Sequence, residues 1–120
     1  MDEEKIKEAY YKFMSDISEI EESKAKCMKE KDNLEAERKI SEFIYGQERE
    51  RFLEFESMYG ESEELISIKN DIGNFYEEDK AELRKQESAL EEEYRDLVQK
   101  EKTIEEEYEK LKYCEDTKDE

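Results

Sequence analysis

The chain has 120 residues, half of which are charged, and its 39 acidic and 21 basic residues leave a net charge of −18. It contains no Pro, Trp or His and only 3 Gly. This length allows one small domain at most, and the low apolar content excludes a large globular core. Such a composition is often typical of disorder. The absence of Pro and the abundance of Glu, Lys and Leu instead favour long helices.

The same counts exclude several classes of function. Without His, the chain has no imidazole base and no His-ligated zinc site. Its two cysteines, Cys27 and Cys114, are too few for a four-thiolate metal site. The net negative charge repels the phosphate backbone of nucleic acids, and no apolar run is long enough to enter and span a membrane. We therefore expect a protein that is not an enzyme, with no cofactor, metal ion or small-molecule substrate.

One strong break interrupts the helical pattern. Gly60, preceded by Tyr59, suits the left-handed residue that follows a helix C-terminus. Ser62 suits an N-cap, and Glu63 and Glu64 then lie in a first turn, where the helix dipole favours acidic residues. The sequence therefore predicts that Tyr59 and Gly60 form a turn between two helices.

The predicted fold is all-α: one long antiparallel two-helix hairpin over residues 1–120, similar to a coiled coil. The first helix is expected at about residues 3–58 and the second at about residues 62–113. Residues 114–120 are expected to fray, as chain ends commonly do.

Both predicted helices carry apolar residues at coiled-coil spacing. In the first helix, steps of three and four residues separate Ile6, Tyr10, Phe13, Ile17 and Ile20. In the second helix, a strict spacing of seven residues relates Leu83, Leu90, Leu97, Ile104 and Leu111. A period of seven requires a left-handed supercoil with another helix alongside.

The register of the hairpin can be predicted because facing residues in antiparallel helices have numbers with a constant sum. Far from the turn, one sum pairs Tyr10 with Leu111, Phe13 with Tyr108, Ile17 with Ile104, and Cys27 with Tyr94. Nearer the turn, a sum lower by one pairs Phe55 with Leu65, Phe52 with Ile68, and Ile44 with Tyr76. Both sums place the turn beside Gly60.

In this register, three leucines of the second helix face basic residues that are also spaced by sevens. Leu97, Leu90 and Leu83 are expected to face Lys24, Lys31 and Arg38, respectively. One interpretation is a self-contained hairpin, in which the alkyl stems cover leucine and the charged ends reach water, Glu101 or Glu87.

The favoured interpretation is that the stripe binds a helix of another protein, because exposed apolar stripes usually mark interfaces. The predicted partner-binding residues are Leu83, Leu90, Leu97 and Ile104. If these leucines serve the internal seam instead, the binding surface is expected around Phe52, Phe55 and Tyr59.

Phe75 and Asp79 fit an aromatic-x-x-x-acid pattern, which also occurs, as chance predicts, at Phe52/Glu56 and Tyr59/Glu63. With two helices, a central turn containing Gly and this pattern, the chain resembles the small Esx-like hairpins of Gram-positive type VII secretion. The segment from Leu83 to Leu111 is rich in Leu, Glu, Lys and Tyr, and in this it resembles the second helix of the Esx-like proteins that are encoded beside LXG toxins. Typical Esx proteins have Trp-x-Gly at the turn, whereas this chain has Met58-Tyr59-Gly60.

This resemblance implies an adaptor, targeting factor or chaperone that binds the helical N-terminal domain of an LXG toxin, together with a second small helical protein in some assemblies. It also implies that Phe75 and Asp79 form an export signal. The N-terminus lacks the basic and apolar regions of a signal peptide. We therefore expect a cytoplasmic protein, with export alongside its partner left open. The alternative function is that of a homodimeric coiled-coil stalk or spacer.

Overall fold

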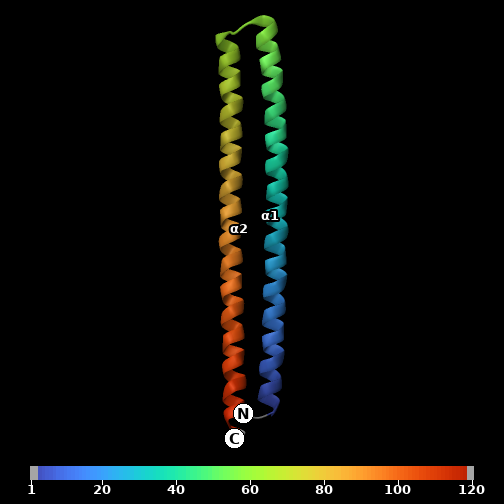
Figure 1. Cartoon of the computed structure of the whole chain (residues 1–120), viewed down its shortest axis with the longest axis vertical. Helices are drawn as coiled ribbons and strands as arrows, with labels where there is room; N and C mark the ends of the chain where they lie inside the picture. Colours follow the sequence, from blue (N-terminus) through green and yellow to red (C-terminus); the bar gives the residue numbers. More distant parts are fainter. Residues whose placement is uncertain (1–2, 119–120) are drawn as a thin grey trace. The chain divides into compact units, whose positions relative to one another are not determined.

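A computed structural model describes the backbone of residues 3–118 and the side chains of residues 3–112. It contains two α-helices, α1 (Glu3–Tyr59, 57 residues) and α2 (Glu63–Lys118, 56 residues), and no strand among the described residues. The chain folds back at the turn between them, so that α1 and α2 pack in opposite directions (Figure 1). The predicted all-α antiparallel hairpin is confirmed.

The turn has the chemistry expected from its sequence. Gly60 has a positive φ of 81°, and its backbone N–H donates to the carbonyl oxygen of Glu56 at 2.8 Å. Such a backbone conformation costs little only for glycine. The Ser62 Oγ accepts a hydrogen bond from the backbone N–H of Leu65 at 3.2 Å, as an N-cap does. One glycine and one serine therefore end α1 and begin α2.

The C-terminal boundary of α2 was predicted too early. The backbone stays helical to Lys118, whereas the sequence pattern suggested an end near residue 113. Residues 114–118 contain neither Gly nor Pro, so no residue in this segment stops a helix. The side chain of Cys114 and residues 119–120 lie outside the described residues.

The packing of the chain divides into two compact units. Unit 1 comprises the described residues of Met1–Lys29 and Leu90–Glu120, and unit 2 comprises Glu30–Ala89, which includes the turn. In each unit, a segment of α1 packs against a segment of α2. We describe the two units separately.

Unit 1 has a mostly apolar seam. Ile20 and Cys27 of α1 are buried, so Cys27 packs inside the hairpin, as its spacing predicts. The ring of Phe13 stacks on that of Tyr108, with centroids 4.3 Å apart and planes 17° apart. This contact confirms the predicted pairing of Phe13 with Tyr108.

Unit 2 keeps the heptad spacing but fills its seam with more polar residues. Tyr45, and not Ile44, stacks on Tyr76, with ring centroids 4.2 Å apart. The predicted pairing of Ile44 with Tyr76 was therefore wrong by one residue. Phe55 is likewise exposed, whereas its neighbour Glu56 is half-buried. The reason is that α1 is uninterrupted, so its seven-residue repeat continues and overrides the more apolar alternative register.

Candidate protein-interaction surface

The leucines predicted to bind a partner lie in the seam between α1 and α2. Leu83, in unit 2, is only 6% exposed. Leu90, Leu97 and Ile104, in unit 1, are half-buried. This burial favours the interpretation in which the stripe holds the hairpin itself together.

The same interpretation expects a basic side chain to lie along the seam while its charged end reaches a carboxylate, and Lys24 does this. Its Nζ donates a hydrogen bond to Glu101 Oε2 at 3.2 Å and lies 5.6 Å from the centre of the Tyr94 ring. The hydrogen bond from Lys24 to Glu101 raises the pKa of the lysine above its ordinary value of 10.5. Lys24 thus occupies a seam position while its charge is satisfied by a carboxylate at the edge, as expected for a long amphipathic side chain.

Polar groups also occupy the seam of unit 2. Ser41, on α1, is half-buried, and its Oγ donates a hydrogen bond to Oδ2 of the exposed residue Asp79, on α2, at 2.8 Å. Near the turn, Glu56 Oε1 is buried without a hydrogen bond, and Lys69 Nζ approaches it only to 3.9 Å. Polar seam residues limit the choice of register but contribute less stability than apolar ones.

The apolar side chains that a seam would normally bury are exposed in unit 2. The exposed large apolar residues of this unit include Ile40, Ile44, Phe55, Ile68 and Phe75. On α2, Ile68 and Phe75 lie one turn either side of Ile72, and on α1 Ile40 lies one turn before Ile44. Each helix therefore carries a second apolar stripe beside the seam.

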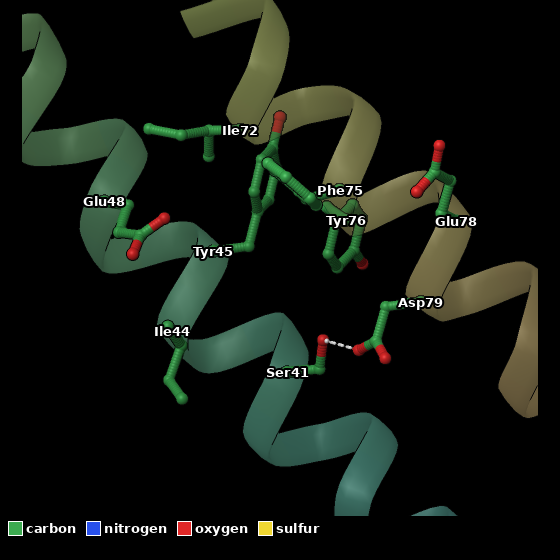
Figure 2. Close-up of a pocket in the computed structure, with 9 residues that line it drawn as sticks. All are labelled: Ser41, Ile44, Tyr45, Glu48, Ile72, Phe75, Tyr76, Glu78 and Asp79. Atoms are coloured by element: carbon green, nitrogen blue, oxygen red, sulfur yellow. Dashed lines mark hydrogen bonds between the residues drawn. The ribbon is translucent and has the colours of Figure 1, made fainter. Parts of the chain in front are cut away.

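These stripes border a groove on the surface of unit 2. A depression of about 650 Å³ is lined by Ser41, Ile44, Tyr45, Glu48, Ile72, Phe75, Tyr76, Glu78 and Asp79. Figure 2 shows the facing rings of Tyr45 and Tyr76 and the hydrogen bond from Ser41 to Asp79 between the two helices. The stacked rings and this hydrogen bond hold the two walls together.

A second depression continues the first toward the turn. It has a volume of about 420 Å³ and is lined by Glu48, Arg51, Phe52, Phe55, Leu65 and Ile72. Glu48 and Ile72 line both depressions, so the two form one surface. We call this surface the unit 2 groove. It includes Phe52 and Phe55, two of the three residues expected to bind a partner if the leucine stripe does not.

The predicted export-signal residues also line the unit 2 groove. Phe75 is 72% exposed, whereas the carboxylate of Asp79 accepts the hydrogen bond from Ser41. Tyr59, in the predicted turn, is the last residue of α1 and is exposed. Its ring lies against that of Phe55, with centroids 4.6 Å apart.

The described residues offer little for metal or membrane chemistry. Within this part of the chain, no group of three His, Cys, Asp or Glu residues is placed to hold a metal ion. Neither helix, over its described length, is apolar enough to cross a bilayer.

Ile44 and Ile72 were not predicted as surface residues of a site. Ile44 was assigned to the seam, although its one-turn spacing from Ile40 could have indicated a second stripe.

Comparisons of the chain with protein-family models, curated proteins and solved structures give no match. The functional argument therefore depends on the residues themselves.

Proposed function

We propose that the protein is a non-enzymatic adaptor that binds a helical segment of another protein through the unit 2 groove. The observation that carries this proposal is the inverted packing of unit 2. Its seam holds half-buried polar side chains such as Ser41 and Glu56, while large apolar residues such as Ile44 and Phe75 remain exposed beside it. Contiguous exposed apolar surface of this kind usually marks an interaction site.

A helix is the partner that suits this surface best. The groove lies between two antiparallel helices, and its apolar residues follow helical spacing. A third helix laid along it would complete a bundle by burying Ile44, Phe55 and Phe75. The resemblance to partners of LXG toxins supports the helical N-terminal domain of such a toxin as the ligand, and supports a role as its targeting factor or chaperone.

The test is co-expression with the tagged helical N-terminal domain of a candidate LXG-type toxin. We expect the two proteins to copurify, and Ile44→Asp to abolish copurification without lowering the helicity of the free chain. Leu53→Asp is the matched control. Leu53 is 50% exposed against 49% for Ile44, but projects from nearly the opposite side of α1.

Two results would contradict this proposal. Copurification that survives Ile44→Asp and Phe75→Asp would remove the groove from the interface. A stable homodimer of the free chain, seen by light scattering and dissociated by Ile44→Asp, would instead support the structural stalk or spacer.

A further inference from the structure

The geometry points to a partner helix of defined chemistry: an amphipathic helix whose apolar face is flanked by Lys or Arg, and not a second copy of this chain. This inference rests on the proposed function, since it names the ligand of the same groove. It follows from two properties of the unit 2 groove, namely the apolar floor and the charge of its edges.

The floor sets the shape of the ligand. From Ile44 to Phe55, the groove follows about three turns of α1, roughly 16 Å. On α2, Leu65, Ile72 and Phe75 lie along the same stretch. A ligand helix of about five turns, with apolar residues at three- and four-residue steps, would cover this length and bury the exposed rings.

The edges set the charge of the ligand. Glu48, Glu78 and Asp79 line the groove, and Arg51 is the basic residue among its lining side chains. Asp71 lies one turn before Phe75 on α2 and adds to this edge. In residues 30–89 as a whole, acidic residues outnumber basic ones by two to one. Basic residues flanking the apolar face of a partner would therefore meet carboxylates on both walls.

A second copy of the chain fits poorly for the same reason. Two unit 2 grooves placed face to face would bring Glu48, Glu78 and Asp79 of one copy near the same residues of the other. Like charges close together at an interface suppress that pairing. The acidic edges therefore select against self-association while they attract a basic helix.

The experiment uses the full chain and three labelled peptides of about 18 residues, long enough for five turns. The first has leucines on one face and Lys at the flanking positions, and the second has the same leucines with Glu at those positions. The third has the composition of the first but a scrambled order, so that it has no apolar face. Binding is measured by fluorescence anisotropy, and the oligomeric state of the free chain by light scattering.

We expect the first peptide to bind at least about tenfold more tightly than the other two. Ile44→Asp and Phe75→Asp should each weaken its binding about tenfold or more, because each removes an apolar contact. Each substitution also adds a negative charge, which by itself would strengthen attraction to Lys. Leu53→Asp adds the same charge outside the groove and should not weaken binding.

The charge of the edge has its own test. Glu78→Lys should weaken binding of the Lys-flanked peptide and strengthen that of the Glu-flanked one. Raising the salt concentration should reduce this difference, because it screens charges at the rim.

Several outcomes would overturn the inference. Equal binding of the Lys- and Glu-flanked peptides would show that the acidic edges do not select the ligand. Equal binding of the scrambled peptide would show attraction by charge alone, without the groove. Self-association of the free chain that Ile44→Asp abolishes would identify a second copy as the occupant.

The failure of this inference is distinguishable from failure of the proposed function. If Ile44→Asp abolishes copurification with the toxin domain but the peptides bind equally, the adaptor role stands and the charge rule fails. If copurification survives both Ile44→Asp and Phe75→Asp, the groove is not the interface and both fail.

Discussion

The burial of Leu83 gives a quantitative test of the seam. Its side chain is 6% exposed in unit 2, so replacing it with alanine removes apolar atoms that the hairpin has withdrawn from water. If Leu83 instead served a partner, the free chain would not depend on it. The substitution Leu83→Ala therefore separates the two interpretations of the leucine stripe.

The magnitude follows from the atoms removed. Leu83→Ala deletes three carbons, which at about 0.8 kcal/mol per buried methylene corresponds to roughly 2.4 kcal/mol of lost transfer free energy. Leucine-to-alanine substitutions in protein cores cost about 2–5 kcal/mol once the cavity is included. The seam between two helices lies close to solvent, so water and neighbouring side chains can fill the space. We therefore expect a loss of about 2–3 kcal/mol in the free energy of unfolding.

The assay is urea denaturation of the free chain, followed by circular dichroism. Leu53→Ala is the control, because it is the same chemical change at a leucine of unit 2 that is 50% exposed. It should cost less than about 1 kcal/mol. If Leu83→Ala costs no more than Leu53→Ala, Leu83 is not held in the seam and the stripe is again available to a partner.

Three further predictions concern the two glycines Gly46 and Gly60, pH and salt. Gly46→Ala should raise the free energy of unfolding by about 1 kcal/mol, because the added methyl group meets no atom within 4 Å in a helix interior. Gly60→Ala should lower it by about 1–2 kcal/mol, because φ is 81° there. Denaturation curves of the two variants should therefore shift in opposite directions, and shifts in the same direction would contradict the turn geometry. Stability should be constant just below pH 10 and fall above it. The pKa values of Lys24 and Tyr76 are raised above 10.5 and 10.0 in the folded chain, which thus holds these protons more tightly than the unfolded chain. Thermal melts that do not change up to about pH 11 would exclude this linkage. Finally, melting temperatures should rise between about 0.01 and 0.15 M salt, because screening weakens the self-repulsion of a net charge of −18. A steady fall would mean that ion pairs such as Lys24–Glu101 outweigh that repulsion.

The hairpin and its turn could be predicted because each depends on local chemistry. Gly60 supplies the positive φ, and Ser62 supplies the oxygen that caps α2. The pairing of Phe13 with Tyr108 followed from the strict spacing of the apolar residues in this part of unit 1. Around this pair, the apolar pattern and the heptad agree on the register, so the sequence predicts one pairing.

In unit 2 the apolar pattern and the heptad disagree, and the prediction failed there. A register chosen to bury the most apolar residues pairs Ile44 with Tyr76. The structure keeps the register in which Tyr45 stacks on Tyr76 and Ser41 donates to Asp79. A change of one residue would require a local insertion or unwinding in one helix, and α1 has neither over its 57 residues. The free energy gained by burying a single apolar residue such as Ile44 does not offset the cost of such an insertion or unwinding.

The same disagreement separates the predicted partner-binding stripe from the exposed apolar residues of unit 2. A spacing of seven places residues on the side of α2 that faces α1, so the regularly spaced leucines contribute to the contact between the two helices. Ile44 and Phe75, which we propose bind the partner, lie out of phase with the repeat and remain exposed.

A polar seam and an apolar flank have complementary consequences for the adaptor role that we propose. The pair Ser41–Asp79 and the stacked rings of Tyr45 and Tyr76 define one register without needing the flanking apolar residues. The register of the two helices is therefore defined even though those apolar residues stay exposed. A fully apolar seam would bind α1 to α2 more strongly, but it would also take Ile44 and Phe55 out of reach. In the proposed adaptor role, unit 2 holds its two walls in register, and the third helix gains its binding energy from exposed apolar surface that the hairpin itself does not bury.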